Sequence, residues 1–218
     1  MSSKITEIIQ LNGEEITFVI ENKKIKNTYF RFRDGKVFIS KSKRMSMKQL
    51  GKYIHDNKEA FIEKVNHSMK YTPRDNAYYL FGELYTVTES NSNKVVLDTV
   101  HNTIAYPSDK VLEHYEKETM LEMLDKLHTH YINNPYISLD GCTYAVRKMK
   151  SRYGSCQPST KKIHINQKLI HYPSHYLEYV YCHEIAHLNE GNHSKKFYDL
   201  LEKLYPNYKQ VRKELKQG

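Results

Sequence analysis

The stretch His183-Glu184-Ile185-Ala186-His187-Leu188-Asn189-Glu190-Gly191-Asn192-His193 places three imidazoles and a carboxylate at spacings that suit a metal site. In a helix, residues four apart lie one above the other, so His183 and His187 can point their rings at one ion. Glu184 lies about 100° around the helix from His183, where it can reach a water molecule beside that ion without being a ligand. The pattern therefore predicts a helix with a metal site on one face.

A turn after this helix is expected to supply a third ligand. Gly191 stands four residues beyond His187, where a helix end often requires a left-handed residue, and His193 follows it. We expect His193 to complete the site. The competing candidates are carboxylates: Glu190, and more weakly Asp199 and Glu202.

Three histidines suit a catalytic zinc site better than a structural one. Structural sites usually have four protein ligands, many of them cysteines, whereas catalytic sites keep one position for water. Zinc lowers the pKa of that water from about 15.7 to about 7, and a carboxylate such as Glu184 can take its proton and deliver it to a leaving amine. The expected cofactor is Zn²⁺, and the expected reaction is hydrolysis of an amide bond.

The residues around the motif argue against a chance match. The chain has 12 histidines, so the five-residue pattern can arise on a solvated helix by chance. However, the flanking residues are apolar on all sides, which predicts a buried helix whose polar groups need a partner. These residues are Tyr176, Leu177, Tyr179, Val180, Tyr181, Cys182, Ile185, Ala186 and Leu188.

Two further motifs carry a family resemblance. Residues 150–156 read Lys-Ser-Arg-Tyr-Gly-Ser-Cys, and residues 192–198 read Asn-His-Ser-Lys-Lys-Phe-Tyr. With tyrosine in place of tryptophan at Tyr153 and Tyr198, residues 149–215 resemble the YgjP-like zinc metallopeptidases, which are related to the WLM-type and SprT-like proteases. Residues 26–64 resemble that family's leading hairpin and helix.

The resemblance implies a zincin-like fold and a peptide or protein substrate. It also implies specific roles: His183, His187 and His193 as metal ligands, and Glu184 as the catalytic acid and base. Because the WLM-type and SprT-like relatives degrade proteins attached to DNA, the resemblance also implies, by analogy, a DNA–protein crosslink protease as an alternative function.

Other residues near the motif are candidates for catalytic or structural roles. Arg152 is a candidate catalytic residue, because a cation near the metal can stabilise an oxyanion; a salt bridge or a solvated charge is an equal alternative. Cys156 is expected to be a structural thiol, since no separate His/Asp set accompanies it. Tyr198 and Tyr208 are weaker candidates for transition-state donors. The remaining nearby histidines are expected to be solvated or to lie beside the ligands: His164, His171 and His175.

The hydrophobic pattern predicts an α+β fold with two lobes. Residues 1–108 form a β-rich lobe with one helix, residues 109–218 form a zincin-like helical lobe with a small sheet, and the boundary lies at Pro107 and Ser108. Two hairpins are expected around Asn12-Gly13 and Asp34-Gly35, and a helix starts from a Ser46 cap. Further strands are expected at residues 78–88, 94–98 and 102–106.

The carboxyl-terminal lobe is expected to begin with a long helix that ends near residue 133. Short strands follow at residues 143–149 and 161–166, and the second is the candidate edge strand for binding a substrate. The metal helix starts near Pro173 and Ser174. One more helix runs to Pro206, and a short one follows it.

The charge and composition of the chain limit which binding partners and which cellular location are expected. The net charge is +9, and basic residues mix with aromatic ones in residues 23–44 and 147–153. This pattern supports an alternative function, a nucleic-acid-binding module with a structural zinc. No apolar run approaches the roughly 20 residues of a membrane span, and the first residues lack the apolar core of a signal peptide. Three scattered cysteines suit reduced thiols. A cytoplasmic protein without a membrane partner is expected.

Overall fold

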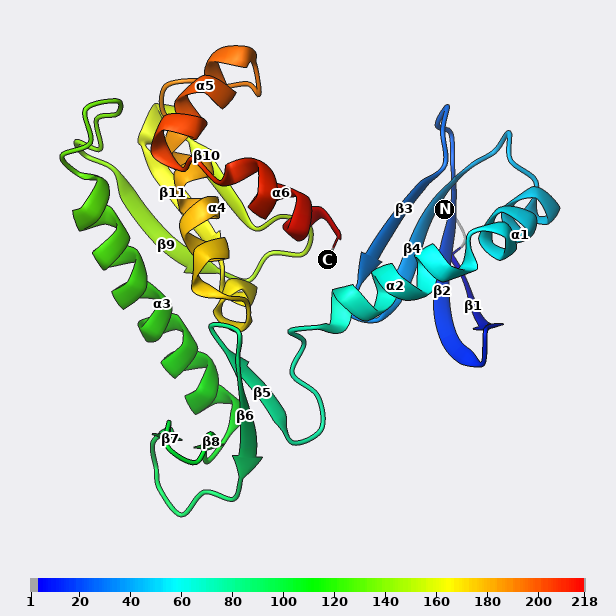
Figure 1. The fold of residues 1–218 in the computed structure, drawn as a ribbon, viewed down its shortest axis with the longest axis horizontal. Coiled ribbons are helices and arrows are strands. Elements are labelled where there is room, and N and C mark those ends of the chain that lie inside the picture. Colours follow the sequence, from blue (N-terminus) through cyan, green and yellow to red (C-terminus); the bar gives the residue numbers. More distant parts are fainter. Residues whose placement is uncertain (1–3, 218) are drawn as a thin grey trace. The chain divides into compact units, whose positions relative to one another are not determined.

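The computed structural model describes residues 4–217, and its backbone contacts divide the chain into two units (Figure 1). Unit 1 is Met1–Thr72 with Glu214–Gly218, and unit 2 is Pro73–Lys213. The ends of the expected lobes, residues 1–3 and 218, lie outside the described residues. The α+β class is confirmed. The boundary expected at Pro107 and Ser108 falls inside unit 2.

Unit 1 contains a four-stranded sheet in the order β1-β2-β4-β3. Both expected hairpins are confirmed. Their two-residue turns have positive φ at both positions, 51° and 87° at Asn12 and Gly13, and 51° and 72° at Asp34 and Gly35. This geometry matches the twist of the strands and explains the Asn-Gly and Asp-Gly pairs. The strands are β1 (Lys4–Leu11), β2 (Glu14–Lys23), β3 (Tyr29–Arg33) and β4 (Lys36–Ser42).

Two helices, α1 (Met47–Asp56) and α2 (Lys58–Met69), stand where one helix was expected. The Ser46 cap is confirmed as a capping box: Gln49 N–H donates to Ser46 Oγ at 3.1 Å, and Ser46 N–H donates to Gln49 Oε1 at 2.8 Å. The helix is interrupted at Asn57, whose backbone (φ −120°, ψ 23°) leaves the helical region. The side-chain amide of Asn57 donates to Tyr53 O at 2.8 Å, which ends the first helix.

Unit 2 begins with a small sheet in the order β5-β6-β8-β7 and a long helix, α3 (Asp109–Tyr131). The expected strand at residues 78–88 is instead a hairpin of two strands, β5 (Ala77–Leu80) and β6 (Glu83–Thr88). The other two expected strands are β7 (Val96–Asp98) and β8 (Thr103–Ala105). Phe81 N–H donates to Ile170 O at 2.7 Å, which fastens this sheet to the segment before the helix that carries His183. Such contacts explain why the sheet belongs to unit 2.

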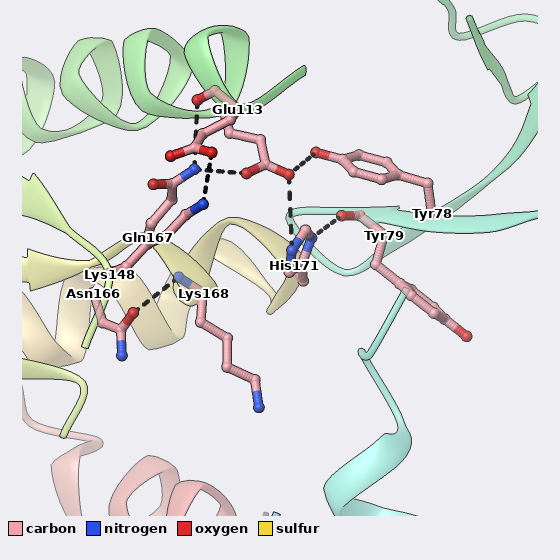
Figure 2. Close-up of polar contacts among 9 residues, drawn as sticks. Tyr78, Tyr79, Glu113, Lys148, Asn166, Gln167, Lys168 and His171 are labelled. Atoms are coloured by element: carbon pink, nitrogen blue, oxygen red, sulfur yellow. Dashed lines mark hydrogen bonds and ion pairs between the residues drawn. The ribbon is translucent and has the colours of Figure 1, made fainter. Parts of the chain in front are cut away.

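A polar network that joins Tyr78, Gln167 and His171 through Glu116 adds to this connection; the first three are labelled in Figure 2. The Glu116 carboxylate accepts hydrogen bonds from Tyr78 Oη at 3.1 Å and from Gln167 Nε2 at 2.7 Å. His171 Nε2 lies 3.8 Å from the same carboxylate, and His171 Nδ1 is 2.9 Å from Tyr79 O. Because a carbonyl only accepts, Nδ1 carries the proton. One side chain on α3 therefore organises β5 and the segment at residues 167–171.

Replacing Glu116 with Ala should lower the free energy of unfolding by about 2–4 kcal/mol, because two half-buried or buried donors lose their acceptor. The matched control is Glu113→Ala on the same helix. Glu113 is 51% exposed and pairs with Lys148 at 2.6 Å, so that change should cost less than about 1 kcal/mol. Urea unfolding of both variants measures the difference. Equal losses would mean that the network contributes nothing beyond a surface ion pair.

A second sheet of unit 2, in the order β10-β11-β9, lies beside the helix that carries His183 and Glu184. Its strands are β9 (Thr143–Arg147), β10 (Gly154–Gln157) and β11 (Lys162–Asn166). The prediction that residues 161–166 form an edge strand is wrong. β11 is the central strand, parallel to β9 and antiparallel to β10, and its Ile163 and Ile165 are fully buried. The edge beside the site belongs to β10, whose residues lie between the two expected strands and were not expected to form a strand.

The remaining helices follow the expected order. The one-turn helix η2 (Gln167–His171) precedes α4 (Ser174–Ala186), which is buried along most of its length, as expected. Helices α5 (Lys195–Leu204) and α6 (Tyr208–Gln217) come next. Ser194 caps α5 by accepting from Phe197 N–H at 3.4 Å. Among the described residues, no helix combines the length and the apolar composition that a membrane crossing requires.

Candidate metal centre

The structure brings His183, His187 and His193 together. Each ring offers one nitrogen to a group whose atoms all lie within 4.8 Å of one another. His183 lies in α4, and His187 caps that helix with helical backbone angles (φ −68°, ψ −13°), so the four-residue spacing keeps both rings on one face. Their ring centroids are 5.0 Å apart. The spacing argument for these two residues therefore holds in three dimensions.

His193 returns to the pair from the segment between α4 and α5. Its Nε2 lies 3.0 Å from Nε2 of His183, and its ring centroid lies 4.8 Å from that of His187. The expected left-handed turn at Gly191 is wrong, because φ of Gly191 is not positive. A Cβ at this position would meet nothing within 4 Å, so no close contact requires glycine here either. The chain turns earlier, where the amides of residues 188–190 donate to the carbonyls of Ile185 and Ala186.

The tautomer of His187 is set by its neighbour. Nδ1 of His187 lies 2.9 Å from the backbone oxygen of Glu190. Because that oxygen can only accept, Nδ1 carries the proton and Nε2 presents a lone pair to the cluster. Glu190, one of the carboxylates considered as third ligand, thus contributes its main-chain carbonyl to the orientation of a histidine.

The other carboxylate candidates are engaged elsewhere. Asp199 accepts from Lys195 Nζ at 2.8 Å, and Glu202 accepts from Lys209 Nζ at 2.9 Å. In the described part of the chain, the group that brings potential ligands together at this place contains histidines alone. The geometry thus favours His193 over the carboxylates.

The donor set fits a zinc ion. Burial, with smaller effects from His187 and His193, lowers the pKa of His183 to about 3, so its ring is unprotonated at neutral pH, as a metal ligand must be. Ligands of a tetrahedral zinc at about 2.0–2.1 Å lie roughly 3.3 Å from each other, close to the observed 3.0 Å between the Nε2 atoms of His183 and His193. Two ring nitrogens at such a distance must share a proton or a cation.

Phe197 forms an apolar floor under the three histidines. Its ring centroid lies 4.9, 4.6 and 4.8 Å from the ring centroids of His183, His187 and His193, and its side chain is fully buried. From the sequence, Phe197 was expected only as part of the 192–198 motif and of the helix that runs to Pro206. Because it touches all three rings, it restricts their rotation and excludes water from one side of the cluster.

Glu184 is buried beside the cluster, with only 6% of its surface exposed. Its carboxylate accepts the backbone N–H of Cys156 on β10. Burial raises the pKa of Glu184 to about 7, while the charge of Arg152 and the Cys156 N–H act in the opposite direction. A carboxyl group with this pKa can both accept and release a proton near neutral pH.

Gly154 explains how β10 approaches Glu184 so closely. A Cβ atom at residue 154 would lie 2.7 Å from both Cγ and Oε1 of Glu184 and 2.9 Å from Cγ1 of Val180. These distances are shorter than any normal contact, so only glycine fits here without a shift. The glycine in the 150–156 motif therefore has a physical reason: it lets a strand backbone lie against the carboxylate.

Gly154→Ala should displace the Glu184 carboxylate and lower peptide cleavage at least tenfold, because small misplacements of reacting groups are costly. Overpacking should also lower the free energy of unfolding by about 1–3 kcal/mol. The matched control is Gly191→Ala, in which the added Cβ has open space. Cleavage rates and urea unfolding check both variants. If Gly154→Ala behaved like Gly191→Ala, the contact with Glu184 would have no functional weight.

Arg152 lies in the loop before β10, and its side chain is exposed. The loop is held by Asn166, whose amide donates to the backbone oxygens of Arg152 at 2.8 Å and Met149 at 2.9 Å. The guanidinium lies close enough to Glu184 to lower the pKa of its carboxyl. The structure therefore places a cation on the Glu184 side of the cluster, as the sequence analysis hypothesised, and shows the anchor that it missed.

Arg212 is a second cation that the sequence analysis did not identify. Its guanidinium lies 4.9 Å from the ring centroid of Tyr198, which stacks on Tyr208 at 5.8 Å and on His193 at 6.1 Å. The charge of Arg212 contributes to the lowered pKa of His183. The sequence alone does not predict an effect of Arg212 on the site, because that effect requires α6 to pack back near the histidines.

The remaining candidates have structural surroundings. Burial raises the pKa of the Cys156 thiol to about 12, which keeps it protonated and agrees with a structural thiol. His171 belongs to the Glu116 network described above. The rings of His164 and His175 are outside the described metal-binding group.

Comparison with protein-family models matches residues 26–218 to the YgjP-like, metallopeptidase domain model. The match spans both units, so it includes the hairpin of β3 and β4 as well as the histidine cluster. No curated protein matches the chain.

Proposed function

The chain belongs to the YgjP-like family of metallopeptidase domains, and from this membership and the site geometry we propose that it is a zinc-dependent peptidase. His183, His187 and His193 would hold the ion. The observation that carries the proposal is a buried Glu184 carboxylate next to a cluster of three histidines, the number of protein ligands that a catalytic zinc uses. When bound, zinc would lower the pKa of a water molecule and polarise the substrate carbonyl.

Glu184 is proposed to act as the general base and then as the general acid. It takes a proton from the attacking water while the water oxygen forms a bond to the carbonyl carbon. It then gives that proton to the amide nitrogen as the carbon–nitrogen bond breaks. The raised pKa of about 7 suits both steps, and the Cys156 N–H keeps the carboxylate oriented between them.

The substrate peptide is proposed to bind along β10. β10 pairs with β11 on one side and forms the edge of its sheet. An extended peptide can add to such an edge through main-chain hydrogen bonds. Since Gly154 and Cys156 on this strand already touch Glu184, a peptide on the outer edge would run past the proposed base.

Arg152 is proposed to stabilise the oxyanion that develops on the carbonyl oxygen. We expect Arg152→Ala to lower kcat by about 10–100-fold with little change in KM, because the charge acts on the transition state more than on the bound substrate. Arg152→Lys should recover part of the rate, since it keeps the charge. A loss confined to KM would show a substrate-binding role, and an unchanged rate would leave Arg152 as a solvated loop charge.

The alternative function, a nucleic-acid-binding module with a structural zinc, explains fewer features of this site than the peptidase proposal does. Structural sites close the coordination with a fourth protein ligand, often cysteine, and have no need for a buried carboxylate. The three cysteines are free, and within the described residues the metal-binding group contains none of them. The peptidase proposal explains Glu184, Gly154 and the cluster together.

Removal and return of the metal test this proposal. The chain as purified with zinc should cleave unstructured peptides, lose the activity when a chelator removes the ion, and regain it when about one equivalent of zinc is added. Magnesium should not restore the rate, because imidazole ligands suit zinc rather than hard oxygen-binding cations. Activity that survives complete removal of zinc would contradict the proposal.

A further inference from the structure

In unit 1, α1 and α2 lie over one face of the four-stranded sheet (Figure 1), whereas Tyr29, Arg31, Arg33 and Lys36 on β3 and β4 are exposed. On the covered face, Phe18, Ile20 and Ile39 are at most 1% exposed and pack with Phe61 and Val65 of α2. Residues that alternate with these along each strand point to the opposite face. The proposed peptidase mechanism does not use the residues of that opposite face.

The pairing register shows which side chains share the opposite face. Across β3 and β4, Tyr29 is opposite Ser40, Arg31 is opposite Phe38, and Arg33 is opposite Lys36. Directly opposed residues in an antiparallel pair point to the same side, so all six belong to one surface. We call this set the β3–β4 face. The Arg33 guanidinium lies 4.8 Å from the Phe38 ring centroid, which confirms that these two share a side.

The β3–β4 face is strongly basic. It contains three cations, and none of its strand residues that the structure describes is acidic. One of the cations, Arg33, pairs with the turn residue Asp34 at 3.2 Å, which offsets part of its charge. On the neighbouring strand β2, the negative charge of Glu21 is offset by Lys23 at 3.1 Å. The Lys43 N–H donates to Lys23 O at 3.3 Å, so the loops after β2 and β4 meet at one end of the sheet. These loops extend the positive surface with exposed side chains: Lys24, Lys26, Lys43 and Arg44.

Aromatic side chains lie among these charges. Tyr29 is 54% exposed, which is unusual for a large ring at a strand position, and Phe38 is half-buried beneath the Arg33 guanidinium. An exposed ring costs free energy in water, so an unpaired aromatic on a solvent-facing strand suggests a partner with a flat apolar surface. Surfaces that bind single-stranded nucleic acid combine cations that contact the phosphate backbone with aromatic rings on which the bases stack.

We propose that the β3–β4 face binds single-stranded nucleic acid. Arg31, Arg33 and Lys36 contact phosphates, and Tyr29 stacks on an unpaired base. The positive surface matches a polyphosphate backbone in charge, and the exposed ring favours an unpaired strand over a duplex, whose bases are already stacked. This activity is separate from the proposed peptidase, because every residue that carries it lies in unit 1 and the histidine cluster lies in unit 2.

The test is fluorescence anisotropy of the full chain with labelled oligo-dT and oligo-U of about 20 nucleotides. The variant Arg31→Gln/Arg33→Gln/Lys36→Gln should bind about tenfold or more weakly at low salt. Each phosphate contact on a single strand contributes about 0.7 to the slope of log affinity against log salt, so the slope should fall in magnitude by about 2. The matched control removes the same charge from exposed positions of α3: Lys110→Gln, Lys117→Gln and Lys126→Gln.

Tyr29→Ala separates stacking from charge. It should weaken binding by roughly 5- to 150-fold while leaving the salt slope unchanged, because stacking on a base releases no counterions. Both β3–β4 variants should cleave peptide at the wild-type rate, so a failure of the peptidase proposal is distinguishable from a failure of this one. Circular dichroism of each variant checks that the sheet is intact.

Three outcomes would overturn the inference. One is equal loss in the α3 control, which would show attraction to net charge alone. Another is equal affinity for poly-glutamate, which would make the face a general site for acidic chains. The third is equal affinity for vesicles that contain phosphatidylserine, which would indicate a membrane surface. Preference for the single strand over all of these, lost in the triple variant, supports it.

Discussion

Replacement of Glu184 with Gln should lower kcat/KM for peptide cleavage by about 10²–10⁴-fold without loss of zinc. This is the usual contribution of a positioned general acid and base. The amide keeps the size of the carboxylate, and its oxygen can still accept the Cys156 N–H, so the surroundings of the site should be preserved. What disappears is the group that takes a proton near neutral pH.

The control for this prediction is Glu178→Gln on the same helix. Glu178 accepts a hydrogen bond from the Tyr131 hydroxyl at 3.0 Å, and a Gln oxygen can do the same. It lies outside the described histidine cluster, so its replacement should leave the rate within about twofold. Steady-state kinetics at equal zinc content compares the two. A Glu184→Gln variant that retained the wild-type rate would remove Glu184 from the general-base role.

The second large effect is expected for His183→Ala. Loss of this ligand should weaken zinc binding more than 100-fold, because changes to groups that merely orient a ligand already cost 10–100-fold. The His183 ring also contacts Tyr179, His187 and Phe197. Its truncation leaves a cavity, so the variant should also be less stable than the zinc-free wild type.

Metal analysis and thermal unfolding measure this effect together. Zinc should raise the melting temperature of the wild type, because an ion that binds only the folded state stabilises it, and should not raise that of the variant. His175→Ala, on the exposed side of α4, should behave as the wild type. His193→Ala should also lose zinc. Full occupancy in His193→Ala would transfer the third position to Glu190 or another carboxylate.

Local sequence signals predicted the elements whose geometry depends on neighbouring residues. Asn12-Gly13 and Asp34-Gly35 both formed the expected turns, since both turn positions have positive φ. Ser46 formed its cap with Gln49. The apolar surroundings of the His-Glu-x-x-His motif predicted a buried α4, and its four-residue spacing predicted the meeting of His183 and His187.

The features that the sequence did not reveal depend on contacts between distant segments. β10 is only four residues long and shows no alternation, because its role is to lie against Glu184 rather than to bury one face. β11 reads as an alternating strand whether it is central or at an edge. The sheet of β5 to β8 was assigned to the first lobe because it follows strands in sequence, yet its contacts are with α3 and η2.

The candidate site shows the same division. His193 was expected as third ligand, but its path was expected to depend on Gly191, whereas the turn closes through amides donating to Ile185 and Ala186. The spacing of residues in the sequence could not predict the roles of Phe197 and Arg212. Both lie on helices after the motif, and only the packing of those helices brings them near the histidines. The sequence pattern therefore predicts the His-Glu-x-x-His motif, whereas the residues that surround the histidines are known only from the packing of the helices.

The most direct measurement is cleavage of a diverse peptide library, read by mass spectrometry, with wild type and Glu184→Gln at equal zinc content. Our account predicts new amino termini at defined sequence positions for the wild type and none above background for the variant. Cleavage by both proteins would contradict the role of Glu184. Absence of cleavage by the fully zinc-loaded wild type would contradict the proposal that the histidine cluster hydrolyses peptide bonds.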